Sequence, residues 1–113
     1  MRSLRPGQIV WVDLGGAVDR EQAGRRPCLV VSSSFHLHGV TTLATIVPCT
    51  TRGRGWENHV PLDGPTGLDQ PTFAMTEQIR TISRLRIHRE GGLVSHDCLA
   101  EVLRWLDTWH RAA

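Results

Sequence analysis

The sequence predicts a mainly β protein, in which several short strands form a small β-barrel and one α-helix ends the chain. Two observations lead to this prediction. Short runs rich in β-branched and apolar residues recur over residues 8–82, and segments rich in glycine, proline and polar residues separate them. Only the C-terminal segment places apolar residues at helical spacing. Strands followed by a single helix are typical of a compact barrel with the helix packed on it.

The expected strands are short, and residues that favour turns lie between them. In chain order we expect strands over residues 8–14, 27–33, 41–48, 59–62 and 72–82, the last being one strand or two with a bend. The intervening segments are a polar loop over 15–24, a turn over 35–39, a basic loop over 52–56 and a proline-rich loop over 61–71. Trp11 is expected in the core of the barrel.

The C-terminal helix has a start signal and one apolar stripe. Ser95 is a suitable N-cap, and Asp97 then lies in the first turn, where the helix dipole favours a negative charge. Leucine and valine side chains follow at helical spacing, at Leu99, Val102, Leu103 and Leu106, with Trp105 and Trp109 beside them. We expect this stripe to pack on the barrel.

The 113 residues suffice for one domain, which we expect to span residues 1–113. The chain contains no apolar run long enough to cross a bilayer, and its first residues lack the apolar stretch of a signal peptide. We therefore expect a cytoplasmic protein without a membrane partner. The cysteines, Cys28, Cys49 and Cys98, are odd in number and widely spaced, which predicts reduced thiols in the core rather than disulfides.

The basic residues are unusual, because all 13 of them are arginine. A bias in genomic composition accounts for part of this. The guanidinium group is nevertheless planar, permanently charged and suited to paired contacts with phosphate. The net charge of +2 is by itself a weak indication of a polyanionic partner.

Three segments carry short motifs in a fixed order. Residues 5–14 (R-P-G-Q-I-V-W-V-D-L) lead into residues 21–31 (E-Q-A-G-R-R-P-C-L-V-V). Residues 47–51 (V-P-C-T-T) and 77–82 (E-Q-I-R-T-I) are the second and third segments. Together they resemble the MazF/PemK family of toxins from type II toxin–antitoxin pairs. The resemblance covers about residues 5–87, and the terminal helix has the right place without a motif of its own.

This resemblance implies a homodimeric SH3-like barrel of the PemK/CcdB type that cleaves single-stranded RNA (mRNA, rRNA or tRNA) without a metal or another cofactor. The 2′-hydroxyl of the RNA attacks the neighbouring phosphate, which leaves a 2′,3′-cyclic phosphate and a 5′-hydroxyl. A cognate antitoxin protein inhibits such enzymes by occupying the RNA channel. The function implied is inhibition of translation and growth.

Two residues correspond to the family's catalytic positions. Arg26 precedes the proline of the first motif, and Thr50 is the first threonine of the second. Arg26 suits the stabilisation of phosphorane charge better than proton transfer, because a guanidinium group hardly deprotonates. Thr50 would donate its hydroxyl to the same phosphate. Arg25 and Thr51 are the alternatives if the register differs by one residue.

Other residues of the motifs and of the basic loop are expected to contact RNA. Arginine residues would bind phosphates, an aromatic residue would stack on an unpaired base, and polar residues would contact bases or order the loop. These are Glu21, Gln22, Arg25, Thr51, Arg52, Arg54, Trp56, Gln78, Arg80, Arg84 and Arg86. For several of them a solvated strand face, or a tryptophan folded back on the barrel, is an equally good interpretation. Arg20 and Ser83 depart from the family's pattern, since many members have a small residue before the Glu21 position and relatives often carry Asp where this chain has Ser83.

Two other interpretations compete with the ribonuclease. Six histidines invite a metal site or a histidine pair, but only His36 and His38 are close in sequence, and no further ligands follow at zinc-like spacing. His59 is the only histidine near Thr50. The other interpretation is a barrel of the same superfamily without catalysis: one that binds nucleic acid, or a CcdB-like toxin that poisons a protein such as a DNA topoisomerase through the terminal helix.

Overall fold

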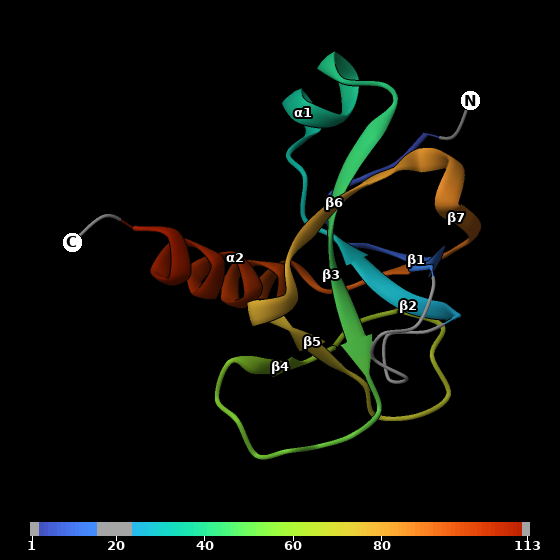
Figure 1. The fold of residues 1–113 in the computed structure, drawn as a ribbon. Coiled ribbons are helices and arrows are strands. Elements are labelled where there is room, and N and C mark those ends of the chain that lie inside the picture. The colour runs from blue at the N-terminus through green and yellow to red at the C-terminus, as the bar shows by residue number, and fades with distance from the viewer. Residues whose placement is uncertain (1–2, 16–23, 112–113) are drawn as a thin grey trace.

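Seven antiparallel strands form one sheet in the computed structural model, which describes residues 3–15 and 24–111 (Figure 1). The strands are β1 (Gln8–Asp13), β2 (Arg25–Val30), β3 (Leu43–Thr50), β4 (His59–Pro61), β5 (Phe73–Met75), β6 (Arg80–Ser83) and β7 (Ile87–Leu93). The helices are α1 (Ser34–Gly39) and α2 (His96–His110), with short 3-10 helices η2 (Thr76–Gln78) and η3 (Arg84–Arg86). The predicted class, mainly β with a C-terminal helix, is confirmed.

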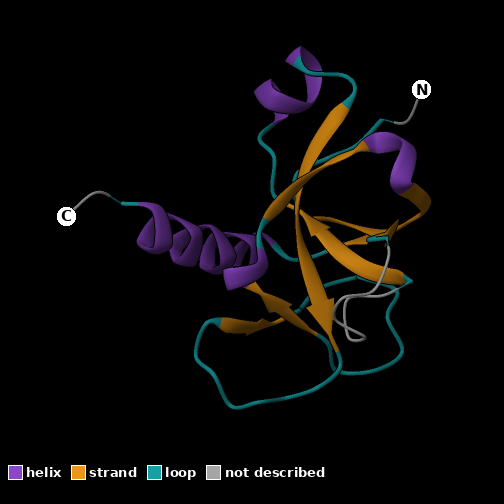
Figure 2. Cartoon of the chain, viewed as in Figure 1, coloured by secondary structure: helices purple, strands orange, loops and turns teal. Residues whose placement is uncertain are grey.

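Strand β3 organises the sheet, because it is the longest strand described and pairs with three others. The strand order is β4-β5-β3-β2-β1-β7, and β6 pairs with β3 as well. The first half of β3 pairs with β6 and its last two residues pair with β5. This division curls the sheet into the barrel-like shape of Figure 2, although the ladders of the described residues do not close into a ring.

Alternation along the strands buries both faces of the sheet. In β1, Val10 and Val12 point into one cluster with residues of β2, β3, β6 and β7, whereas Ile9 points to the opposite face. That opposite face is covered by α2, whose Cys98, Val102 and Leu106 pack over Ile9, Leu29 and Val47. Successive strand residues point to opposite faces, so one strand serves two cores.

The terminal helix begins as the sequence predicts, and its buried stripe differs by one residue. The Ser95 side chain accepts a hydrogen bond from the Cys98 backbone N–H at 3.1 Å, as an N-cap does. Val102 and Leu106 are buried as expected, but Leu103 is 42% exposed. Cys98 takes the place that was predicted for Leu103, so the prediction for Leu103 is wrong. The buried stripe of α2 therefore runs through Cys98, Val102 and Leu106, and the leucine at position 103 lies to one side of it.

Two segments differ from their predicted structure, and a third matches one of its two predicted alternatives. The turn expected over 35–39 is the six-residue helix α1, which Ser33 caps by accepting a hydrogen bond from the backbone N–H of His36 at 3.0 Å. For residues 72–82, expected as one strand or two with a bend, the second alternative is confirmed, because β5 and β6 are separated by η2. The strand expected over 27–33 begins earlier, at Arg25, and ends at Val30. Strand β7 was not predicted at all.

Candidate active site at the ends of β2 and β3

A pocket of about 260 Å³ opens where β2 begins and β3 ends. Its lining comes from two short segments, Arg25–Pro27 and Cys49–Thr51. The β2–β3 ladder explains why these segments meet. It pairs Cys28 with Pro48, and two residues farther along each strand are Arg26 and Thr50. The two residues predicted to be catalytic are thus brought together by the register of one antiparallel pair.

Arg26 is half-buried, and the backbone of β3 holds its guanidinium group. The Nη1 atom donates a hydrogen bond to the carbonyl oxygen of Cys49 at 3.2 Å. A guanidinium group has five N–H donors. The contact with the carbonyl uses one of these donors and leaves others for an anion. The rival, Arg25, also lines the pocket, but it is exposed and lies opposite Asp13 at the end of the β1–β2 ladder.

Thr50 is buried, with 7% of its surface exposed. Its Oγ1 accepts a hydrogen bond from the backbone N–H of Arg52 at 3.1 Å. The side chain therefore closes the turn after β3, which is the structural role a strand-end threonine often has. The hydroxyl hydrogen is not used in that bond, so the same group can still donate to a ligand. Thr51 is exposed and lines the pocket next to Thr50.

The thiols beside this pocket are buried core groups. Burial raises the pKa of Cys28 to about 12, although the positive charges of Arg26 and Arg80 act in the opposite direction. Burial also raises the pKa of Cys49 well above its usual range. A thiol that stays protonated is a poor nucleophile. The prediction that both cysteines are core residues is confirmed, and neither is suited to attack a substrate.

A second pocket, of about 310 Å³, adjoins the first. Pro27 and Thr51 line both pockets and so separate them. The rest of the second lining comes from β1, β7 and the loop before β5, namely Trp11, Gly67, Leu68, Asp69, Gln70, Thr72 and Arg89. The Arg89 guanidinium lies over the Trp11 ring, 4.7 Å from its centroid. Trp11 is thus a half-buried pocket residue, and the prediction that it belongs to the core is wrong.

The basic loop after β3 begins at the first pocket and then leaves it. The Trp56 ring packs on the His59 ring of β4, with 4.7 Å between their centroids, and the Arg54 guanidinium lies 5.6 Å from the Trp56 centroid. Trp56 remains 52% exposed. Of the two interpretations of this loop, the fold-back of the tryptophan describes its position better. Arg52 is exposed beside Thr50.

The remaining predicted RNA contacts lie on other parts of the surface. Gln78 is exposed in η2, and Arg80 is exposed at the start of β6, opposite Ile46 of β3. Arg86 lies in η3, with its Nη1 close to the backbone of Gly15. None of these three lines the pocket of Arg26 and Thr50. Glu21 and Gln22 fall outside the described residues.

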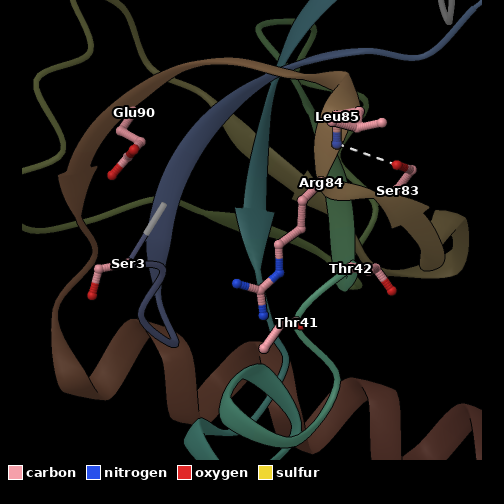
Figure 3. A pocket seen from close by; sticks show the side chains of 7 residues that line it. All are labelled: Ser3, Thr41, Thr42, Ser83, Arg84, Leu85 and Glu90. Atoms are coloured by element: carbon pink, nitrogen blue, oxygen red, sulfur yellow. Dashed lines mark hydrogen bonds between the residues drawn. The ribbon is translucent and has the colours of Figure 1, made fainter. Parts of the chain in front are cut away.

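Arg84 holds the segment around α1. Its side chain donates to the backbone carbonyl oxygens of Leu37, Val40 and Leu43, the last through Nε at 2.9 Å. It also lines a larger pocket of about 740 Å³, away from Arg26 (Figure 3). In Figure 3 the Arg84 side chain extends toward Thr41, while the Ser83 hydroxyl accepts a bond from the Leu85 backbone. These carbonyl contacts give Arg84 a structural role.

His59 does not reach the pocket. It is 4% exposed, and its Nε2 atom lies 3.0 Å from both carboxylate oxygens of Glu77. Partial burial raises the pKa of Glu77, but the hydrogen bonds from His59, its own backbone and Asn58 together lower that pKa below its usual value. Within the described ranges, no cluster of three or more histidine, cysteine, aspartate or glutamate side chains could hold a metal ion. No helix in this part of the chain is long and apolar enough to cross a membrane.

Sequence reasoning missed the second pocket. Trp11 and Arg89 are cross-strand partners in β1 and β7. Because β7 was not predicted, nothing in the sequence indicated that an arginine would lie on this tryptophan. Asp69 and Gln70 lie in the proline-rich loop, and only the fold brings them to Trp11.

The comparisons with known proteins agree with the fold and with the motifs. A family model described as PemK-like, MazF-like toxin of type II toxin–antitoxin system matches residues 5–110. The endoribonuclease toxin MazF of Escherichia coli strain K12 is 34% identical over 77 residues, 68% of this chain and 66% of that protein. Endoribonuclease MazF9 of Mycobacterium tuberculosis is 35% identical over 105 residues, 88% of this chain and 89% of that protein.

Solved structures give the same result over the full length. The MazE-MazF (Form-II) structure from Deinococcus radiodurans matches with a TM-score of 0.80 and 28% identity, covering 100% of both chains. MazF (Form-I) from the same organism matches with a TM-score of 0.76 and 30% identity, covering 96% of this chain and 97% of that one. The family that the motifs indicated is confirmed, and it is favoured over the CcdB-like alternative. The chain belongs to the family of PemK-like, MazF-like toxins of type II toxin–antitoxin systems.

Proposed function

We propose that this chain is the toxin of a type II toxin–antitoxin pair and acts as an endoribonuclease on single-stranded RNA. The observation that carries the proposal is the meeting of Arg26 and Thr50 at one pocket, with the guanidinium held by the Cys49 carbonyl. Relatives that cover most of this chain have the names of endoribonucleases. The pocket supplies cationic and hydroxyl donors at one place, which is what binding a phosphodiester requires.

The proposed reaction is an attack of the RNA 2′-hydroxyl on its own 3′-phosphate. The new bond joins O2′ to phosphorus, and the bond from phosphorus to the leaving 5′-oxygen breaks. The O2′ proton passes to solvent water, and the 5′-oxygen takes up a proton from water. The products are a 2′,3′-cyclic phosphate and a 5′-hydroxyl. The intermediate phosphorane gathers negative charge on its non-bridging oxygens. Donors that already point to this charge lower the barrier, because they need not reorganise during the reaction.

Arg26 and Thr50 are assigned to that charge. Arg26 would offer two parallel N–H donors to the non-bridging oxygens, and Thr50 would donate its hydroxyl hydrogen. The described lining of the pocket contains no carboxylate or imidazole group. We therefore assign charge stabilisation, and not proton transfer, to the pair. Arg25 and Thr51 at the rim would position the RNA backbone.

The partners follow from the family. We propose that a cognate antitoxin binds this chain, because a matching solved structure from Deinococcus radiodurans contains both MazE and MazF. We further propose that the toxin is a homodimer and acts in the cytoplasm, where messenger RNA is translated. Cleavage of that RNA would stop growth when the antitoxin is absent.

The test is an assay of purified protein with single-stranded RNA in excess EDTA. We expect cleavage that survives chelation, with cyclic phosphate and 5′-hydroxyl at the new ends. Mass spectrometry of the fragments identifies both groups. Intact RNA, or cleavage that EDTA abolishes, would overturn the proposed reaction. Poisoning of a topoisomerase in the same preparation would instead support the CcdB-like alternative.

A further inference from the structure

We propose that the pocket between Trp11 and the loop before β5 binds a nucleobase next to the cleaved phosphate, and that Asp69 and Gln70 select that base. This inference rests on the proposed ribonuclease function. It assigns residues outside the three sequence motifs to the choice of cleavage site.

The position of the pocket supports this assignment. It shares Pro27 and Thr51 with the pocket of Arg26 and Thr50, so the two are adjacent hollows of one surface. Consecutive groups of an RNA strand alternate between phosphate and base-bearing sugar. A phosphate seated on Arg26 would therefore place a neighbouring base beside the Pro27–Thr51 divide.

A row of side chains across three strands forms the floor of the pocket. Strand pairing puts Pro27 of β2 opposite Trp11 of β1, and Trp11 opposite Arg89 of β7. The Arg89 guanidinium lies over the indole, 4.7 Å from the ring centroid. Aromatic rings and guanidinium planes are the groups on which unpaired bases stack. The volume, about 310 Å³, is at the lower end of the roughly 300–1,000 Å³ of small-ligand sites.

The charges of the two pockets differ in a way that separates phosphate from base. The first pocket has two arginines and, among its described residues, no acidic group. The second has one arginine, which already lies over Trp11, together with Asp69 and the amide of Gln70. A carboxylate repels phosphate and accepts hydrogen bonds from the amino groups of bases. The second pocket therefore suits a base edge better than a phosphate.

Asp69 and Gln70 are available for such contacts. Their side chains make no hydrogen bond or ion pair with other residues in the described part of the chain, and both are exposed. An ionised carboxylate is an acceptor only. It pairs with the exocyclic amino group of adenine, cytosine or guanine, whereas uracil offers only its N3–H, which lies between two keto oxygens that repel a carboxylate. We infer that the base in this pocket carries an amino group.

The loop that carries these residues is firmly held. The buried Thr72 donates its hydroxyl to the Gln70 carbonyl oxygen at 2.9 Å, and Leu62 N–H donates to the Thr72 carbonyl oxygen at 2.8 Å. Gly92 of β7 donates its N–H to the Thr66 carbonyl oxygen at 3.1 Å. A Cβ atom added at Gly92 would lie 2.0 Å from the Pro65 carbonyl oxygen, so the loop and β7 are in close contact. A site on a rigid support selects ligands better than a mobile one.

The experiment compares cleavage-site preference for the wild type, Asp69→Asn and Asp63→Asn. Asp63 is the matched control, since it is an exposed aspartate of the same loop, lies outside both pockets, and accepts through its side chain from no described residue other than Gly64, by its N–H. Each protein digests a long RNA of mixed sequence, and sequencing of the new ends gives the preference at each position. The specificity constant kcat/KM is then measured on oligonucleotides that differ only at the selected position.

We expect the wild type to prefer an amino-bearing base over uracil at one position beside the cleaved bond. Asp69→Asn should reduce that preference at least about fivefold, because an amide can also donate to a keto oxygen, while the preference at other positions is kept. Asp63→Asn should match the wild type. An unchanged preference in Asp69→Asn, or a wild type that selects uracil or nothing beside the cleaved bond, would overturn the inference.

A second pair of variants tests the stacking floor. Arg89→Gln removes the guanidinium from Trp11 and should raise KM more than it lowers kcat. Arg104→Gln is its control, because Arg104 lies over Trp105 on α2, 6.0 Å from that ring, and touches neither pocket. Equal effects of the two changes would contradict a role for the floor. A wild type that cuts no RNA overturns the proposed function itself, whereas cutting with unchanged selection overturns only this inference.

Discussion

Replacing Arg26 with alanine should nearly abolish RNA cleavage while the protein remains folded. The side chain contributes one described hydrogen bond to the fold, from Nη1 to the Cys49 carbonyl oxygen at 3.2 Å. Its loss should destabilise the protein by about 1 kcal/mol. The catalytic loss should be larger. Removing one preorganised donor to developing charge typically lowers kcat by about 10²–10³-fold, or ~2.7–4 kcal/mol of barrier.

The assay is single-turnover cleavage of a fluorescent oligoribonucleotide, with circular dichroism melting of each variant as the test of folding. Arg26→Lys should fall between the wild type and Arg26→Ala, because an ammonium group keeps the charge but lacks the planar pair of donors. Arg25→Ala is the neighbouring comparison. Arg25→Ala should raise KM and lower kcat by less than about tenfold, since that exposed side chain is assigned to positioning the RNA backbone. Arg26→Ala with a kcat within tenfold of the wild type would refute the assignment, as would an equal loss of kcat in Arg25→Ala.

Three further outcomes are expected. Thr50→Val should lower both cleavage and stability, the latter by about 1 kcal/mol in urea titration, because the partly buried Arg52 N–H loses its acceptor, whereas Thr50→Ser should keep both. The pKa of Glu77 is lowered in the folded protein, so the ionised side chain stabilises the fold. This stabilisation is complete at pH values above the unfolded pKa and is lost as the pH falls through the folded pKa. In thermal melting, Glu77→Gln should therefore be less stable than the wild type at pH 7 and equally stable near pH 2. Leu106→Ala should cost about 2–5 kcal/mol in urea titration and Leu103→Ala less than about 1 kcal/mol, because only the first is buried.

The sequence predicts Arg26 and Thr50 as a candidate pair through the resemblance of two short motifs to those of the family. Arg26 directly precedes Pro27, Thr50 lies two residues after Pro48, and both strands have strong β-forming composition. Once two such strands pair, the register alone brings their ends together. The N-cap of α2 is predictable as well, since Ser95 and the first helical turn are adjacent in sequence.

Strand β7 could not be predicted, because its own residues do not show alternation. Its burial pattern has one buried residue, Ile87, followed by four exposed ones and two half-buried ones, and it contains Gly91 and Gly92. Pairing with β1 stabilises this segment, and that pairing is itself irregular, with register shifts on both sides of Val10 and Trp11. The glycines that weaken the strand signal are needed where the loop at Pro65 approaches the backbone.

The second pocket escaped prediction for a related reason. Trp11 belongs to an alternating strand, and such a residue next to buried valines is naturally expected in the core. The face of β1 that carries Ile9 is covered by α2, but Trp11 lies where a loop and Arg89 cover it instead. The group that packs over a strand residue, a helix or a loop, is determined by tertiary contacts with segments far along the chain. Sequence periodicity predicts the face of the sheet to which a strand residue points, but it does not predict the element that packs on that residue.

The most direct test of the account uses an oligoribonucleotide that carries a single 2′-deoxy substitution at the nucleotide on the 5′ side of the mapped cleavage site. If the 2′-hydroxyl is the nucleophile and Arg26 and Thr50 stabilise the phosphorane, this oligonucleotide should remain intact at that bond. The all-ribose control should be cut at the same bond in the presence of EDTA. Cleavage of the deoxy-substituted bond at a rate comparable to the control would contradict the proposed reaction.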